Sequence, residues 1–266
     1  MKFTKMHGLG NDYLYVYGEA PDNIVSLSQK LSDRHFGAGS DGMIYIAPSA
    51  VADFKMRIFN ADGSEAMMCG NGIRCVGKYV YDKGYTDRTE LTIETLSGIK
   101  ELKLRLRGGR AAAATVGMGK AVVSSDLSLE VCGRLLGCTP VSVGNPHAVF
   151  FVENAEAVPL TEWGPAVEHD PAFPGGVNAE FVQVITPTEL RMRVWERGSG
   201  VTMACGTGSC ASVAAAVAKG YCQYGVPVAV HLDGGTLEIS VAPDGSVTMT
   251  GPAATVYEGE TDDAEA

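Results

Sequence analysis

The chain has 266 residues, 45% of them hydrophobic and 20% charged, and its formal net charge is -10. This is the composition of an ordinary globular protein and excludes a disordered chain. The negative charge excludes nucleic acid as a partner, because neutralising phosphates requires clustered Lys and Arg.

The first half of the chain predicts a set of strands around one central helix. Alternating hydrophobic residues between turns rich in Gly, Asn and Asp indicate strands over 2–6, 12–17, 42–47, 55–60, 91–95 and 100–107. A short helix is expected over 26–34, and the small and apolar residues after Cys69 predict a second one. The composition changes at 108–110, and we place a domain boundary at 116–119.

The second half predicts the same order of elements. Its expected strands are 140–143, 148–152, 177–185, 190–195, 226–232, 236–241 and 246–250. A helix is expected after Cys205. Residues 211–218 are small and apolar nearly all round, which is typical of a helix enclosed by sheet on every side.

One short sequence motif occurs twice. The letters MMCGNG, which contain Cys69, return as MACGTG, which contain Cys205. A shift of 136 positions aligns 56–85 with 192–221, and nine of these thirty positions are identical. We infer that the two halves of the chain are copies of one duplicated unit.

The repeat predicts two domains of similar construction, because its period is too long for a solenoid of short units. We expect the first domain to span 1–117, with 252–266 returning to it. The second should span 118–251. Each copy is expected to offer one cysteine to a shared cleft.

Both repeated cysteines stand where a helix is predicted to begin. Unpaired N–H groups and the positive end of the helix dipole lower the pKa of such a thiol from about 8.5 toward neutrality. The glycines that follow, Gly70 and Gly206, leave N–H groups uncovered, so a carboxylate can lie against them. The motif therefore combines a proton-transfer group with an anion site.

A cysteine beside glycine is also compatible with burial as a small hydrophobic residue. We adopt that interpretation for the cysteines without a counterpart in the other copy: Cys75, Cys132, Cys138, Cys210 and Cys222. Seven cysteines are an odd number, so a disulfide framework is not expected. A metal site is not expected either, because the sequence has no Cys-x-x-Cys or His-x-x-x-His spacing.

Seven short motifs spread over the chain form a specific set. They are Gly8–Asp12, Phe59–Ser64, Cys69–Cys75, Gly144–His147, Val177–Ala179, Trp195–Gly198 and Ala204–Gly208. Together they resemble the motifs of the diaminopimelate epimerase family. The resemblance implies an α+β fold of two pseudo-symmetric domains, each a barrel-like, mostly antiparallel sheet around a central helix.

The resemblance also implies an activity, the epimerisation of LL-2,6-diaminopimelate to the meso form in lysine and peptidoglycan precursor biosynthesis, without a cofactor. Cys205 is expected to accept the α-proton, and Cys69 to return a proton on the opposite face. His147 and Glu196 are expected beside the cysteines, where they tune their protonation.

The residues implied in substrate binding are Asn11, Asn60, Gly70, Asn71, Asn145, Asn178, Glu196, Arg197, Gly206 and Thr207. Neutral amides both donate and accept, which suits a zwitterionic substrate. Arg197 is expected to bind the distal carboxylate, and Glu196 an ammonium group. Gly42 stands where some family members carry Gln, so that side-chain contact is absent here.

The expected partners are a small amino-acid substrate and a second copy of the chain, because Tyr257 resembles the dimer-contact tyrosine of the family. No apolar run is long enough for a signal peptide or a membrane span, so we expect a cytoplasmic enzyme with no membrane partner. Two alternatives stay open: a racemase or epimerase of proline, hydroxyproline or histidine, and a non-catalytic thiol-redox or small-molecule-binding protein. Arg197 and Asn178 favour a substrate with a distal carboxylate.

Overall fold

The computed structural model describes residues 1–262 and divides into two compact units. The first is Met1–Val116 with the C-terminal segment from Gly251, and the second is Gly117–Thr250. Residues 263–266 of the predicted return segment lie outside the described residues. Within residues 1–262, none of the helices has the length and apolar character needed to cross a membrane.

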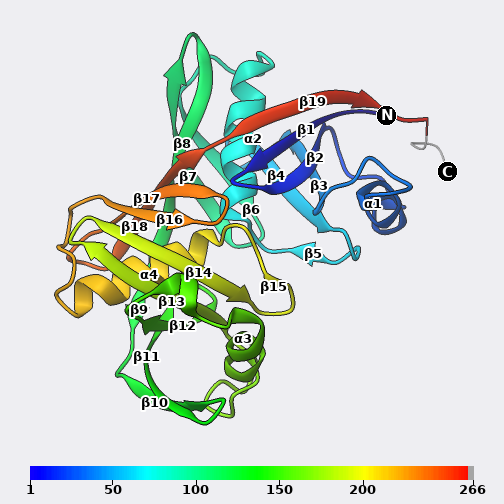
Figure 1. Cartoon of the computed structure of the whole chain (residues 1–266). Helices are drawn as coiled ribbons and strands as arrows, with labels where there is room; N and C mark the ends of the chain where they lie inside the picture. Colours follow the sequence, from blue (N-terminus) through cyan, green and yellow to red (C-terminus); the bar gives the residue numbers. More distant parts are fainter. Residues whose placement is uncertain (263–266) are drawn as a thin grey trace. The chain divides into compact units, whose positions relative to one another are not determined.

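The first unit holds one sheet, mostly antiparallel, with its strands in the order β19, β1, β2, β3, β4, β6, β7 and β8. The pairs β2–β3 and β4–β6 are parallel, and the short β5 pairs with β4. The bounds are β1 (Lys2–Gly8), β2 (Asn11–Tyr17), β3 (Gly42–Pro48), β4 (Phe54–Asn60), β5 (Glu65–Ala66), β6 (Glu90–Thr95), β7 (Gly98–Arg107), β8 (Arg110–Lys120) and β19 (Ala254–Glu260). The last strand therefore lies beside the first, with Lys2 opposite Glu260 (Figure 1).

Two helices complete the first unit. The helix α1 (Ile24–Ser32) buries Leu27 and Leu31 in a core formed with β1 to β4. The helix α2 (Gly70–Asp82) packs against β1, β2 and β7 and is buried from Gly70 to Val80. Burial along almost its whole length fixes the position of its N-terminus.

The second unit repeats this plan, with strands in the order β10, β11, β12, β13, β14, β16, β17 and β18. The pairs β12–β13 and β14–β16 are parallel, and the short β9 and β15 pair with β11 and β14. The strand bounds are β9 (Val122–Val123), β10 (Leu127–Val131), β11 (Arg134–Ser142), β12 (Pro146–Phe151), β13 (Asn178–Thr186), β14 (Glu189–Glu196), β15 (Gly200–Val201), β16 (Val228–Leu232), β17 (Gly235–Val241) and β18 (Ser246–Pro252). The helices are η1 (Ala155–Ala157), α3 (Leu160–Glu168) and α4 (Gly206–Ala218).

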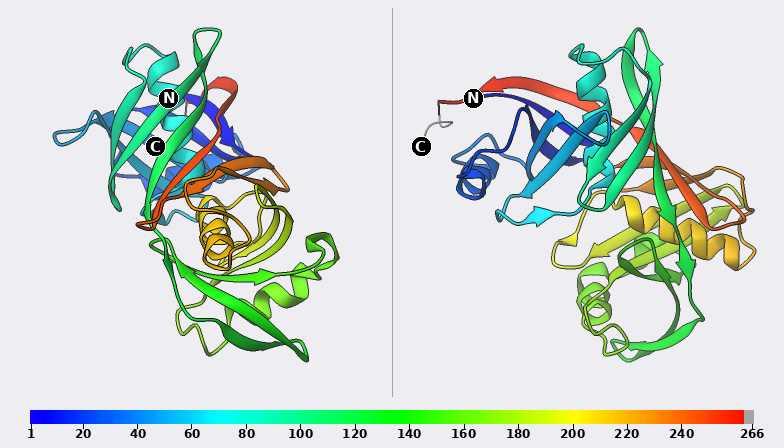
Figure 2. Two further views of the ribbon diagram at one scale, coloured as in Figure 1. Left: turned by 90° about the vertical axis from the view of Figure 1, so that its left-hand side faces the viewer. Right: turned by 180° about the vertical axis from the view of Figure 1, so that it is seen from behind.

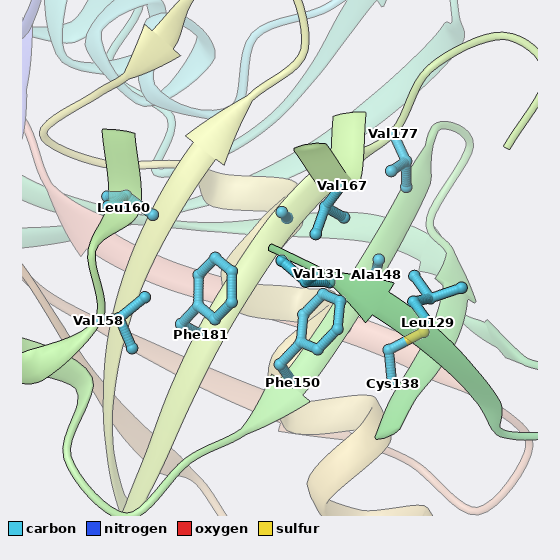
Figure 3. Packing of buried hydrophobic residues seen from close by; sticks show 11 residues of the cluster. Leu129, Val131, Cys138, Ala148, Phe150, Val158, Leu160, Val167, Val177 and Phe181 are labelled. Atoms are coloured by element: carbon cyan, nitrogen blue, oxygen red, sulfur yellow. The ribbon is translucent and has the colours of Figure 1, made fainter. Parts of the chain in front are cut away.

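The helix α4 is enclosed by the strands of its own unit, as predicted from its small residues. It packs against β11 to β14 and β17, and the left view of Figure 2 shows these strands around it. Gly206 and residues 208–217 are buried. A second layer of the core lies between the sheet and α3, where the rings of Phe150 and Phe181 stack with centroids 5.1 Å apart (Figure 3).

The strand registers show that the two units are built alike. Leu14 of β2 pairs with Met43 of β3, and Ala148 of β12 pairs with Ala179 of β13, each time in parallel. The α+β fold class with two pseudo-symmetric units is therefore confirmed.

The central helices also end alike. Gly84 and Gly220 both adopt φ 77°, a left-handed conformation that glycine takes without strain and that ends a helix. The N–H of the following tyrosine then bonds back into the helix, from Tyr85 to the carbonyl of Val80 at 2.9 Å. This explains why Lys-Gly-Tyr occurs twice in the sequence.

Six strands were absent from the sequence analysis: β5, β8, β9, β10, β15 and β19. The hairpin of β10 and β11 turns at Cys132 and Gly133, which have φ of 49° and 76°. Positive φ at both residues is typical of a two-residue turn, but cysteine is not a usual signal for it. In β8 four alanines follow the first residue, Arg110, and alanine has a weak strand propensity.

Candidate active site

Cys69 is the N-cap of α2. Its backbone is extended, with φ -135° and ψ 117°, so the side chain turns back over the first turn and Sγ accepts a hydrogen bond from the N–H of Gly72 at 3.3 Å. The thiol donates to Oδ1 of Asn11, also at 3.3 Å. The sulfur is therefore held between a helix N-terminus and an amide.

Asn11 is in turn held by charged residues that the sequence analysis did not single out. Its Nδ2 donates to Oδ2 of Asp41 at 2.8 Å, and the N–H of Asp12 donates to the same oxygen at 3.1 Å. Nη2 of Arg34 bridges Asp12 and Asp41, at 2.8 Å to each. Burial raises the pKa of Asp12, but hydrogen bonds from Arg34 and Lys5 outweigh it and hold this pKa below its ordinary value.

Asn71 and Asn60, which were predicted to contact the substrate, both make hydrogen bonds inside the first unit. Oδ1 of Asn71 accepts from Nη2 of the fully buried Arg74 at 3.0 Å. Nδ2 of Asn60 donates to Oγ of Ser64 at 3.1 Å. The positive end of the helix dipole at this end of α2 favours an anion.

Gly42 begins β3 in a conformation that excludes a side chain. Its φ is 154°, and a Cβ there would lie 2.1 Å from the carbonyl oxygen of Phe59. Gln at this position would therefore need a different backbone path. The local geometry of β3 thus explains why the side-chain contact noted in the sequence is missing here.

Cys205 caps α4 in the same way. Its φ is -114° and its ψ 112°, and Sγ accepts a hydrogen bond from the N–H of Gly208 at 3.3 Å. Oγ1 of Thr207 lies 3.6 Å from the sulfur. Cys205 is only 4% exposed, whereas Cys69 is half-buried. The two cysteines thus share their cap geometry and differ in burial.

The predicted lowering of the thiol pKa toward neutrality is wrong for Cys205. Burial raises this pKa well above its ordinary value, and the charges of Glu196 and Glu180 raise it further. Hydrogen bonds from Thr207 and from the N–H of Gly208 lower the pKa without overcoming burial. Burial also raises the pKa of Glu196, whose Oε1 accepts from the hydroxyl of Thr202.

His147 belongs to a buried polar chain that begins at a residue the sequence analysis missed. Its Nδ1 lies 2.7 Å from Oε1 of Glu180, and both side chains are fully buried. Its Nε2 lies 3.0 Å from Oδ1 of Asn145, and Nδ2 of Asn145 donates to Oγ1 of Thr207 at 3.3 Å. The chain therefore connects Glu180 to the hydroxyl beside the sulfur of Cys205.

Asn178 and Arg197 are joined through the backbone. Nδ2 of Asn178 donates to the carbonyl of Pro146 at 2.9 Å, and its Oδ1 accepts from the N–H of Arg197 at 3.0 Å. The side chain of Arg197 lines a cavity of about 350 Å³. The other lining residues are Glu168, His169, Asp170, Pro171, Phe173, Pro174, Gly175 and Gly176.

The structure thus groups the predicted residues into one cluster in each unit. The first cluster is Cys69, Asn11, Gly70 and Asn71, and the second is Cys205, Gly206, Thr207, Asn145, His147 and Glu196. Glu180 was missed, although the 136-position shift aligns it with Ile44 and so marks a carboxylate in place of an apolar residue. Among residues 1–262 no three His, Cys, Asp or Glu side chains are arranged to hold a metal ion.

Comparison with known proteins identifies a family and close relatives. A family model described as "Diaminopimelate epimerase" matches residues 3–124 and 139–256. The chain is 51% identical to the diaminopimelate epimerase of Acetivibrio thermocellus, over 98% of this chain and 99% of that one. It is 49% identical to the diaminopimelate epimerase of Methanococcus maripaludis, over 98% and 100%.

Solved structures share the fold at much lower identity. A phenazine biosynthesis protein of Bacillus anthracis superposes with a TM-score of 0.78 at 16% identity, covering 98% of both chains. A probable proline racemase of Agrobacterium radiobacter superposes with a TM-score of 0.74 at 17% identity, covering 98% of this chain and 93% of that one. At such identities the likeness concerns the fold alone.

Proposed function

We propose that this chain, which belongs to the diaminopimelate epimerase family, interconverts LL- and meso-2,6-diaminopimelate by exchanging one α-proton between two cysteines. One observation carries the proposal. Cys69 and Cys205 cap equivalent helices, and each sulfur accepts a hydrogen bond at 3.3 Å from the N–H of the glycine three positions further along the chain. Two equivalent thiols suit a reaction that needs a proton carrier on each face of one carbon.

The proton transfer balances without a redox change. The thiolate of Cys205 takes the α-proton, so that the C–H bond breaks and an S–H bond forms. The thiol of Cys69 then gives its proton to the opposite face, so that its S–H bond breaks and a new C–H bond forms. Roles exchange in the reverse direction, which begins from the state that the forward reaction leaves, with Cys205 as the thiol and Cys69 as the thiolate. A further forward turnover requires Cys205 to lose its proton to the solvent and Cys69 to regain one.

The carbanionic transition state needs donors aimed at the α-carboxylate, because an amino-acid α-proton is only weakly acidic. The first N–H groups of α2 and α4, at Gly70, Asn71, Gly206 and Thr207, are suited to this task because they stand at the positive end of a helix dipole. This proton transfer requires no cofactor, since the thiols and the backbone supply the necessary groups.

The rest of the substrate is assigned to other predicted side chains. Arg197 would bind the distal carboxylate, and its backbone is held by Asn178. Glu196 would bind an ammonium group. Asn11, Asn60 and Asn145 would orient the zwitterion through neutral amides.

The proposal places the enzyme in the cytoplasm, in the synthesis of lysine and of peptidoglycan precursors, as a homodimer. Tyr257 is the candidate interface residue. Tyr257 is 40% exposed, and the neighbouring Val256 is 53% exposed. Exposed apolar side chains on the strand β19 support a contact there, and sedimentation equilibrium would measure the dimer directly.

The substrate is tested by isotope exchange. LL-diaminopimelate in heavy water should gain deuterium at one Cα as the meso form appears on chiral chromatography. Lysine is the matched control, because it lacks the distal carboxylate and should be rejected by orders of magnitude. Preferential racemisation of proline, hydroxyproline or histidine would refute the diaminopimelate assignment and leave the two-cysteine chemistry in place.

A further inference from the structure

Both ring nitrogens of His147 have a polar partner. Nδ1 faces a carboxylate oxygen of Glu180 at 2.7 Å, and a carboxylate only accepts. Nε2 faces Oδ1 of Asn145 at 3.0 Å, while Nδ2 of that amide donates to Thr207. With the Asn145 amide in this orientation both ring nitrogens face acceptors, an arrangement that suits two N–H donors, and 2.7 Å lies in the range of charge-assisted hydrogen bonds.

An imidazolium at His147 fixes which group donates and which accepts in each hydrogen bond from His147 to Thr207. Because Oγ1 of Thr207 accepts from Asn145, its own proton can point to the sulfur of Cys205, 3.6 Å away. A neutral His147 would keep its proton toward Glu180 and turn Nε2 into an acceptor. The Asn145 amide would then turn over, and Thr207 would donate to Asn145 instead of to the sulfur.

The fold itself does not require Glu180. The equivalent residue of the first unit is Ile44, which pairs with Ile58 as Glu180 pairs with Val194. Both residues lie against the glycine of a cysteine motif. A Cβ on Gly208 would lie 2.7 Å from Oε1 of Glu180, and one on Gly72 would lie 2.7 Å from Cδ1 of Ile44. The space beside the motif glycine thus holds an apolar side chain in the first unit and a carboxylate in the second.

Burying the carboxylate of Glu180 at this position is energetically unfavourable. Glu180 is fully buried, and its Oε2 has no hydrogen-bond partner among residues 1–262. An unpaired buried oxygen of this kind is unfavourable unless something else compensates. An apolar residue at the same position of the fold would avoid that cost, so the reason for Glu180 lies in what it does to its neighbours.

We propose that Glu180 is a positioning residue for the epimerisation: it holds His147 as the imidazolium and thereby turns Asn145 and Thr207 to donate toward the sulfur of Cys205. This inference rests on the proposed function, in which Cys205 must become a thiolate. These hydrogen-bonded side chains transfer no proton to the substrate. The hydroxyl of Thr207 acts only by donating a hydrogen bond that stabilises the thiolate of Cys205. The charged groups that face His147 and the sulfur are Glu180 from β13 and Glu196 from the end of β14.

The test compares two variants that each remove one carboxylate charge, Glu180→Gln and Glu196→Gln. Alkylation of Cys205 by iodoacetamide, followed by peptide mass spectrometry from neutral to alkaline pH, measures its thiolate without any turnover. If Glu180 acted only through its charge, both variants would be alkylated faster, because both charges raise the pKa of Cys205. We expect Glu196→Gln to react faster and Glu180→Gln to react at least about tenfold more slowly, which corresponds to about 1.4 kcal/mol. Cys69, in the other unit, serves as the internal reference.

Thr207 provides a second pair of variants, so that the test survives if Glu180→Gln fails to fold. Thr207→Val should show the same slow alkylation, and Thr207→Ser should keep the original rate. Nitrogen-15 shifts of the His147 ring should show an imidazolium at neutral pH in the unaltered protein and a neutral ring in Glu180→Gln. Faster or unchanged alkylation in Glu180→Gln, equal rates for the Thr207 variants, or a neutral His147 in the unaltered protein would each overturn the inference. Failure to epimerise diaminopimelate, with the alkylation pattern intact, would overturn the proposed function alone.

Discussion

The indole Nε1 of Trp195 donates a hydrogen bond to Oε2 of Glu168 over 2.6 Å. The other carboxylate oxygen of Glu168 accepts the N–H of Gly198 at 2.8 Å. One side chain therefore holds both ends of the segment that carries Glu196 and Arg197. The hydrogen bond from Trp195 also holds the pKa of Glu168 below its ordinary value.

Replacing Glu168 by Ala should mainly weaken substrate binding. The segment loses two hydrogen bonds to a charged group, and each such bond is worth about 1.5 to 3 kcal/mol. We expect KM for diaminopimelate to rise about tenfold or more, with a smaller change in kcat, because Glu168 itself does not touch the cysteines. Steady-state kinetics measure both values, and a fall in kcat at constant KM would contradict this role.

The two motif glycines should respond differently to alanine. In Gly208→Ala the new Cβ would meet Oε1 of Glu180 at 2.7 Å and Sγ of Cys205 at 3.2 Å. In Gly72→Ala the nearest atom is the terminal Cδ1 of Ile44, a side chain without a polar partner to lose. Overpacking of this kind costs about 1 to 3 kcal/mol.

We therefore expect Gly208→Ala to lose much more activity than Gly72→Ala at a comparable loss of thermal stability. Thermal unfolding followed by circular dichroism, together with the epimerisation rate of each variant, checks both halves of this statement. Equal activity in the two variants would show that the contact between Gly208 and Glu180 is not important for the reaction.

Cys69→Ala and Cys205→Ala should each abolish epimerisation and leave the fold intact. Each face of the α-carbon needs its own proton carrier, and the loss of a general acid or base typically costs about 10²- to 10⁴-fold. Serine variants should be only slightly better, because a hydroxyl is a much weaker acid than a thiol. Deuterium incorporation at Cα measures the residual exchange. Full turnover by either alanine variant would remove the two-base mechanism.

Asp12 should make the protein sensitive to acid. Its pKa is lowered in the folded state, so its contribution to stability is present above the unfolded value of about 4 and is lost as the pH falls through the folded value. Asp12→Asn should therefore lower the free energy of unfolding at neutral pH by about 1 to 3 kcal/mol. It should also flatten the loss of stability below about pH 5.

Urea unfolding at several pH values tests this prediction for Asp12. The matched control is Asp62→Asn, because Asp62 also has a lowered pKa but lies in an exposed turn, where Ser64 donates to it. We expect the control to change the acid dependence less than Asp12→Asn does. An unchanged acid dependence in Asp12→Asn would show that the ion pairs with Lys5 and Arg34 do not contribute.

Most elements of the fold could be predicted from local signals. The strands β1 and β4 alternate in hydrophobicity, and α4 consists of small apolar residues that only a fully enclosed helix would carry. The strands β8 and β10 could not be predicted in this way. The first half of β8 consists mainly of alanines, and the turn after β10 relies on Cys132 in a left-handed conformation. Their strand conformation comes from pairing with neighbours and not from their own residues.

By itself the sequence determined the duplication, the two cysteine caps and the family motifs, because these depend on residue types at fixed spacings. Only the tertiary structure decided the surroundings of the cysteines. The pKa of Cys205 depends on burial by strands far away in the sequence, and this outweighs the helix N-terminus on which the local argument relied. Glu180 and His147 are 33 positions apart along the chain, and they meet only because β12 and β13 are parallel neighbours in the sheet. Contacts of this kind arise from packing and cannot be seen in a linear motif.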